Sequence, residues 1–244
     1  MAEKYSANMY KMFGKGQLIA PYVKSAILKE VWPDNLIITD PYFHDSNEDD
    51  YFHPSTHALY GAKAIYHKLH PELRKELKAN NRMTFEQQIT VIMGSVYHSI
   101  IQSNLVQQGL VSEFDVEVPM VDDERHWRGH ADLVFKGDLA DIKSMNAMAF
   151  DRVQAPYNSW KYQMAPYMDY RGKDRAIILV VEMGKPWAMK EFIIQRDEIL
   201  LKEIYDKWAR VREALAAGEE PEDCCKPENS MFCPLNCKGE LYKG

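Results

Sequence analysis

The stretch GHADLVFKGDLADIKS, from Gly129 to Ser144, decides the fold of this chain. Two short strand-like runs, Gly129 to Phe135 and Asp138 to Lys143, meet at Lys136-Gly137-Asp138. A glycine in a short link between two such runs is typical of a tight turn. The sequence therefore predicts a β-hairpin at the centre of the protein.

The segments around this hairpin predict an α+β fold. Thr84-Phe-Glu-Gln87 has the form of a capping box, so we expect a helix from there to about Gln108, with Gly109 as its left-handed stop. The other expected elements are helices over 55–78 with Pro71 opening the second, strands over 114–120, 176–183 and 188–195, a helical segment over 148–170 interrupted near Pro156, and a helix that Asp197 caps and Gly218 ends. Together they predict a central mixed β-sheet flanked by helices.

Composition limits the classes of function. The chain has 244 residues, 46% of them hydrophobic, and 30 Lys and Arg against 36 Asp and Glu give a net charge of −6. This length fits one main core, and the acidity argues against a polyanion binder that works by charge alone. No apolar run approaches the roughly 20 residues that span a bilayer, and the first residues lack a secretory h-region. We therefore expect a cytoplasmic protein with no membrane partner.

We expect three regions along the chain. Residues 1–52 form an N-terminal helical appendage, with a helix over 17–31 and an exposed acidic loop at 45–50. Residues 53–218 form the core, and residues 219–244 form a cysteine-rich, metal-binding tail packed on it. The tail holds all four cysteines of the chain: Cys224, Cys225, Cys233 and Cys237. In a reducing compartment, such spacing favours a metal site over disulfides.

The central hairpin holds a candidate site for a catalytic metal. Asp141 and Lys143 are two residues apart on a strand, so both point to one face, where burial is costly unless they are paired or bind a ligand. The hairpin also brings Asp132 alongside Asp141. Two converging carboxylates suit Mg²⁺ or Mn²⁺, and Lys143 is then placed to orient water and neutralise charge on a phosphate. The alternative is a partly exposed sheet face that bears charges without a ligand.

Two helices supply further candidates. Gly94 and His98 are four residues apart and share a helix face, and the glycine lets that helix approach the sheet closely. Gln163 and Tyr167 share a face of a later helix at the same spacing. For each of these side chains, a structural role is the alternative.

These residues together resemble a known family. Gly-x-x-x-His98, Gly-x-x-Asp132, Asp141-x-Lys143 and Gln163-x-x-x-Tyr167 follow in the order and spacing of motifs in the RecB-type branch of the PD-(D/E)XK nuclease superfamily. Within it, the chain is most similar to the small exonucleases of CRISPR adaptation and of phages, which have a C-terminal cysteine cluster. The resemblance covers about residues 53–240 and implies a restriction-endonuclease-like fold.

The resemblance implies a role for each of these residues. His98, Asp132 and Asp141 would ligate the catalytic Mg²⁺ or Mn²⁺, with Asp141 in a place often held by Glu, and Lys143 would be the catalytic lysine. Gln163 and Tyr167 would support the site and contact DNA. Glu113 or Glu117 would assist from the preceding strand, and the sequence does not choose between them.

The tail departs from the pattern of that family. Members with a cluster place their first cysteine near position 62 or 63, where this chain has Ala62 and Lys63. The four tail cysteines offer enough thiolates for one tetrahedral Zn²⁺ or for an iron–sulfur cluster. Because adjacent cysteines bind one metal only with strain, His53 or His57 is an alternative fourth ligand. Zinc and iron–sulfur both stay open, and unligated thiols are the remaining alternative.

The function that the resemblance implies is a metal-dependent deoxyribonuclease. It would hydrolyse phosphodiester bonds as an exonuclease on linear or single-stranded DNA, in recombination, replication or repair. DNA is the expected partner, together with a recombination or replication protein, in the host cytoplasm if a phage encodes the chain. Two alternatives stay open, a structure-specific endonuclease on the same core and a non-catalytic nucleic-acid or partner-binding module. Retention of both Asp residues and the Lys favours an enzyme over the binding module.

Overall fold

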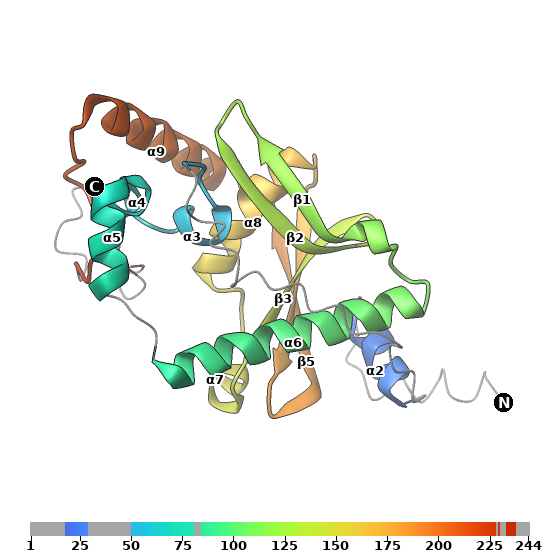
Figure 1. The fold of residues 1–244 in the computed structure, drawn as a ribbon. Helices are drawn as coiled ribbons and strands as arrows, with labels where there is room; N and C mark the ends of the chain where they lie inside the picture. Colours follow the sequence, from blue (N-terminus) through green and yellow to red (C-terminus); the bar gives the residue numbers. More distant parts are fainter. Residues whose placement is uncertain (1–17, 29–49, 81–83, 228, 230–232, 238–244) are drawn as a thin grey trace.

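The centre of the protein is a five-stranded mixed sheet in the order β1-β2-β3-β4-β5 (Figure 1). The computed structural model describes residues 18–28, 50–80, 84–227, 229 and 233–237. The strands are β1 (Val116–Asp122), β2 (Trp127–Phe135), β3 (Asp138–Met145), β4 (Arg175–Glu182) and β5 (Lys185–Gln195). Neighbours are antiparallel except β3 and β4, which run parallel. This mixed sheet with its flanking helices confirms the α+β fold expected from the sequence.

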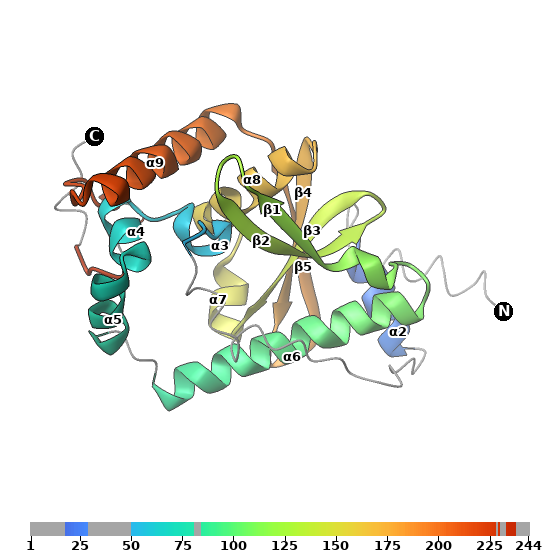
Figure 2. The ribbon, with the colours of Figure 1, turned by 45° about the horizontal axis from the view of Figure 1, so that its top comes forward.

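Helices cover both faces of the sheet (Figures 1 and 2). The helices are α2 (Ala20–Leu28), α3 (Pro54–His57), α4 (Ala62–Leu69), α5 (Pro71–Asn80), α6 (Phe85–Gln107), the 3₁₀ turn η1 (Glu113–Asp115), α7 (Ala147–Arg152), α8 (Asn158–Tyr170) and α9 (Glu198–Ala217). One core joins α2 and α6 to the sheet, with Leu105 packed in the same cluster as Ile142. The other joins α8 and α9 to the opposite face, where Met168 and Trp208 belong to the cluster of Ile178. The sheet is therefore the middle layer of three.

Local capping chemistry sets the ends of the long helices. Thr84 accepts a hydrogen bond from the Gln87 N–H (3.3 Å), and the Gln87 side chain accepts one from the Thr84 N–H (2.8 Å). Gly109 follows α6 with φ 67°, in the left-handed region that ends helices. Asp197 caps α9, and Gly218 ends it with φ 69°. These helix boundaries are confirmed.

Turn geometry fixes the central hairpin. Lys136 and Gly137 both have positive φ, 52° and 87°, which is the pattern of a type I′ turn between twisted strands. Strand β1 begins at Val116, two residues later than the strand expected over 114–120. Ser112 caps a 3₁₀ turn there by accepting a hydrogen bond from the Phe114 N–H (3.2 Å).

The N-terminal part of the core differs from expectation, because residues 54–80 form three helices and not two. The extra break falls at Gly61, which precedes α4 in an extended conformation. A Cβ at Gly61 would lie 2.0 Å from the backbone carbonyl carbon and oxygen of Cys224, and the Lys63 N–H donates to the Asp223 carbonyl (2.9 Å). The tail backbone thus lies directly on the start of α4, a contact that requires glycine.

Helix α2 belongs to the core below the sheet. The N–H groups of Ile19, just before the helix, and of Ala20, its first residue, donate to the Glu191 carboxylate on β5. Ile19 and Val23 are fully buried. The remainder of the helix expected over 17–31 and most of the acidic loop at 45–50 lie outside the described residues. Among the helices that the structure describes, none combines the length and apolar character needed to cross a bilayer.

Candidate active site

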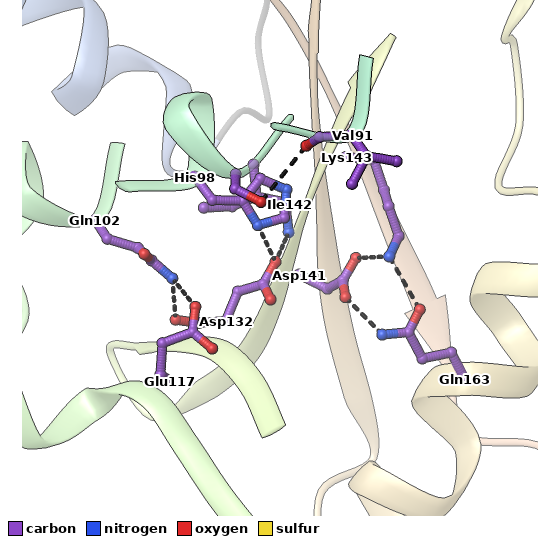
Figure 3. Close-up of polar contacts among 10 residues, drawn as sticks. Val91, His98, Gln102, Glu117, Asp132, Asp141, Ile142, Lys143 and Gln163 are labelled. Atoms are coloured by element: carbon purple, nitrogen blue, oxygen red, sulfur yellow. Dashed lines mark hydrogen bonds and ion pairs between the residues drawn. The ribbon is translucent and has the colours of Figure 1, made fainter. Parts of the chain in front are cut away.

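The candidate site lies where β2 and β3 separate. Their pairing runs from the turn to Leu133 and Ala140 and goes no further. Beyond that pair, the Ile142 N–H donates to the Asp132 carboxylate (2.6 Å). A side chain thus takes the place of the next backbone acceptor, and the opening between the strands holds Asp132 and Asp141 (Figure 3).

On the α8 side of this opening, Asp141 forms a closed set of contacts with Lys143 and Gln163 (Figure 3). Lys143 Nζ lies 2.8 Å from Asp141 Oδ2 and donates to Gln163 Oε1 (2.9 Å). Gln163 Nε2 donates to Asp141 Oδ1 (2.8 Å). The expected spacing of two residues on β3 therefore places both charges toward α8, and the glutamine fixes their orientation.

On the α6 side, His98 contacts the second carboxylate. His98 Nδ1 lies 3.3 Å from Asp132 Oδ2. A Cβ at Gly94 would lie 2.9 Å from Ser144 Oγ, so the glycine does permit the close approach of α6 to β3. Two helices on opposite faces of the sheet thus reach the same opening.

Two further residues lie in this region. The sequence analysis does not choose between Glu117 and Glu113, and it does not single out Gln102. Gln102 Nε2 donates to Glu117 Oε1 (2.7 Å) and to the Asp132 carbonyl (2.9 Å). Of the two glutamates left open, Glu117 thus lies at the site, whereas Glu113 is exposed on η1. The signal for Gln102 was its position four residues after His98, which places both side chains on one helix face.

Burial dominates the electrostatics of the site. It raises the pKa of Asp141 to about 6 even though the Lys143 ammonium opposes the shift, and the Asp132 charge adds to it. Burial likewise raises the pKa of Asp132 and of Glu117 above their ordinary values. Carboxylates that are costly to ionise where they lie are stabilised when a cation binds among them.

Tyr167 lies behind the site and not at its surface. Its side chain is only 2% exposed, and a Cβ at Gly129 would lie 2.4 Å from its hydroxyl oxygen. Burial raises the pKa of this hydroxyl, so it stays protonated. Tyr167 therefore packs between α8 and β2, one helical turn beyond Gln163.

The donor set suits a hard divalent cation. It offers carboxylate oxygens and one imidazole. Asp141 Oδ2 is buried, and the Lys143 ammonium lies 2.8 Å from it. The ligand atoms of His98, Asp132 and Asp141 do not all lie within 4.8 Å of one another. Among the described residues, the four cysteines are the only group of three or more His, Cys, Asp or Glu residues that meets this limit.

The four cysteine thiols converge in the tail. Cys233 Sγ lies 3.4 Å from Cys224 Sγ and 3.2 Å from Cys237 Sγ, and all four sulfurs lie within 4.8 Å of one another. The Gly61 N–H donates to Cys225 Sγ (3.3 Å). The alternative ligand His57 is engaged elsewhere, because its Nδ1 accepts the His53 N–H (2.9 Å). Four clustered thiols can hold a metal ion without a histidine.

No protein-family model matches the sequence, and no curated protein matches it. Among solved structures, the crystal structure of SSO0001 aligns with a TM-score of 0.48 and 14% identity, over 90% of this chain and 95% of that one. An alkaline exonuclease from Laribacter hongkongensis aligns with a TM-score of 0.45 and 16% identity, over 64% of this chain and 87% of that one. Both scores lie below 0.5, so neither structure assigns an activity to this chain.

Proposed function

We propose that this chain is a nuclease that uses Mg²⁺ or Mn²⁺ to hydrolyse phosphodiester bonds in DNA. The observation that carries the proposal is the placement of Asp132 and Asp141 at the opening between β2 and β3, with Lys143 paired to Asp141. One buried and one half-buried carboxylate beside a single ammonium are expensive as a purely structural device. The same set is what phosphodiester hydrolysis requires, since it binds a cation and stabilises charge on a phosphate.

Each side chain has a distinct role in this proposal. Asp132, Asp141 and His98 would hold the cation, which when bound polarises the phosphate and lowers the pKa of water. Lys143, with its side chain 26% exposed, faces the substrate side and stabilises the negative charge that develops on the phosphate oxygens. Gln163 holds Asp141 and Lys143 in a fixed relation through its two hydrogen bonds. Tyr167 packs α8 against Gly129 of β2.

We further propose that the enzyme is an exonuclease that acts on linear or single-stranded DNA. The test is degradation of end-labelled linear single- and double-stranded DNA, with closed circular DNA beside it, in Mg²⁺, Mn²⁺ or EDTA. Loss of linear substrate that requires the cation and that Lys143→Met abolishes is the expected result. Lys202→Met is the matched control, because Lys202 is exposed on α9 and pairs with Asp206.

The outcomes separate the proposals. Cleavage of circular DNA would replace the exonuclease by an endonuclease on the same site. Equal activity of wild type and Lys143→Met would remove Lys143 from the reaction. A folded wild type that is inert on every substrate with either cation would overturn the nuclease and support a binding module instead.

For the tail, we propose one tetrahedral Zn²⁺ bound by Cys224, Cys225, Cys233 and Cys237. Zn–S bonds of about 2.3 Å in a tetrahedron put the sulfurs roughly 3.8 Å apart. Sulfur separations of 3.2 and 3.4 Å, with none beyond 4.8 Å, fit one ion. A cubane binds each thiolate through a different iron and so needs wider spacing.

Metal analysis of the purified full chain tests this proposal. We expect one zinc per chain, no acid-labile sulfide and no visible absorption band. Iron with acid-labile sulfide in anaerobically purified protein would show an iron–sulfur cluster and refute the zinc proposal, and iron without sulfide would show a single-iron site.

A further inference from the structure

We infer that Lys226, in the cysteine tail, is a positioning residue for the proposed active site and acts on it through Tyr162 of α8. The inference rests on the proposed nuclease function and concerns what holds the geometry of the same site. Helix α8 contacts both α9 and β4 (Figure 1). A contact made on its α9 side therefore bears on its position against the sheet.

Three side chains from distant parts of the chain form a closed set of contacts. Lys226 Nζ lies 2.7 Å from Glu203 Oε2 on α9 and donates to the Tyr162 hydroxyl (3.4 Å). The Tyr162 hydroxyl in turn donates to Glu203 Oε1 (3.0 Å). The tail, α9 and α8 are thus joined at one point, where Tyr162 is only 7% exposed.

The tail backbone that bears this lysine is anchored. Lys226 directly follows Cys225, whose Sγ accepts the Gly61 N–H (3.3 Å). The carbonyl of Asp223 accepts the Lys63 N–H (2.9 Å). Both contacts tie this part of the tail to the start of α4, so the ammonium of Lys226 reaches α8 from a fixed backbone.

Tyr162 immediately precedes Gln163, the residue that fixes Asp141 relative to Lys143. Successive side chains of a helix point about 100° apart, so Tyr162 contacts the tail while Gln163 hydrogen-bonds to Lys143 (2.9 Å) and Asp141 (2.8 Å). Rotation of α8 by about 10° moves atoms at the ~5–6 Å radius of its side chains by about 1 Å.

A displacement of this size is enough to disturb the site. Lengthening by about 1 Å takes either hydrogen bond of Gln163 out of the normal range. Misplacement of a reacting group by about 1 Å costs up to about a hundredfold in rate. The contact between Lys226 and Tyr162 therefore helps to set the orientation in which Gln163 holds Asp141 and Lys143.

Lys226→Met tests this inference, because it removes the ammonium and keeps a long unbranched side chain. With the full chain, we would measure the single-turnover rate on linear DNA at saturating enzyme, the enzyme concentration that half-saturates this rate, and amide hydrogen exchange of residues 158–170. We expect the rate to fall roughly ten- to a hundredfold, an unchanged half-saturating concentration, and faster exchange in α8. A lost DNA contact would instead raise the half-saturating concentration.

Lys63→Met is the matched control. Lys63 pairs with Glu220 at the same distance as Lys226 with Glu203, 2.7 Å, and both lysine side chains are 28% exposed. The pair of Lys63 joins the tail to α4 and not to α8, so this variant should keep the wild-type rate and wild-type exchange in α8. Because partly exposed ion pairs contribute little to stability, the two variants should have equal melting temperatures.

Tyr162→Phe removes only the hydroxyl and provides a second test. It should slow cleavage to a similar extent, and the double variant with Lys226→Met should be no slower than the slower single variant, because both changes break one link. A wild-type rate in Lys226→Met would overturn the inference. Multiplied effects in the double variant, or equal slowing of Lys63→Met, would overturn it as well.

Failure of this inference is distinguishable from failure of the nuclease proposal. If wild type and Lys226→Met cleave DNA equally fast, only the positioning role of Lys226 is refuted. If wild type is inert on every DNA substrate with Mg²⁺ and with Mn²⁺, the nuclease is refuted, and hydrogen exchange in α8 still decides whether Lys226 holds this helix.

Discussion

Asp141→Asn should stabilise the metal-free protein although it removes a central residue of the site. The pKa of Asp141 is about 6, against an ordinary 3.8, and burial is the main cause. At about 1.4 kcal/mol per pKa unit, its ionised form costs about 3 kcal/mol of folding free energy. Asparagine mimics the protonated side chain and can still accept the hydrogen bond of Gln163, so the variant avoids this cost.

The sign of the pH dependence follows from the raised pKa. Between about pH 4 and pH 6 the folded state binds more protons at Asp141 than the unfolded state, so the contribution of this residue to stability falls as pH rises. The advantage of Asp141→Asn should therefore be near zero at pH 4 and reach about 3 kcal/mol by pH 7 to 8. Urea unfolding of both proteins in EDTA across this range measures it directly.

The control lies on the same strand. Asp138 pairs with Arg175 (2.6 Å) at the exposed end of β3, so Asp138→Asn should lower stability slightly, by roughly 0.2–1 kcal/mol. Added Mn²⁺ should stabilise wild type and Asp138→Asn by mass action and leave Asp141→Asn unchanged. If Asp141→Asn proves less stable than wild type at pH 8 in EDTA, then ionised Asp141 does not destabilise the metal-free fold and the reasoning is refuted.

Three further variants test other contacts. Gly61→Ala puts a Cβ 2.0 Å from the Cys224 backbone, so we expect faster release of the proposed zinc to a chelator and a lower melting temperature. The control Gly184→Ala, whose Cβ would meet its nearest atom at 3.5 Å, should match wild type in both measurements. Gly129→Ala puts a Cβ 2.4 Å from the Tyr167 hydroxyl; single-turnover cleavage should slow at least tenfold with an unchanged circular dichroism spectrum, and a wild-type rate would contradict a supporting role for Tyr167. Burial lowers the pKa of His53 to about 4, so folding loses up to about 3 kcal/mol as pH falls from 6.5 to 4, and His53→Gln should flatten this loss in acid unfolding curves or else the histidine is not the cause.

Features set by neighbouring residues were predictable from the sequence. The capping box at Thr84 and the glycine turn at Gly137 depend on side chains and dihedrals within a few positions, and both appear as expected. The break at Gly61 was not predictable in this way, because the tail backbone that requires it lies more than 160 positions further along the chain.

The candidate site divides along the same line. The spacing of Asp141 and Lys143 on one strand placed both on one face, since alternation is a local property. The separation of β2 from β3, which lets the Asp132 carboxylate accept the Ile142 N–H, is a property of the two strands together and not of the residues of either strand alone. The contact of Gln102 with β1 and β2 depends on how α6 lies across the sheet, and no local pattern encodes that angle.

The placement of all four thiols in the tail has a consequence for chain entropy. Cys224 and Cys237 are 13 positions apart. A metal-binding side chain in place of Gly61, whose N–H contacts Cys225 Sγ, would instead close a loop of 164 positions with Cys225. Because the entropy of loop closure grows with the logarithm of loop length, the longer loop would restrict the unfolded chain by about 2 kcal/mol more. If an ion is bound by the tail cysteines alone, folding lacks this additional stabilisation. Loss of the ion would then open only the short loop from Cys224 to Cys237, and the sheet that positions the carboxylates would keep its own cooperativity.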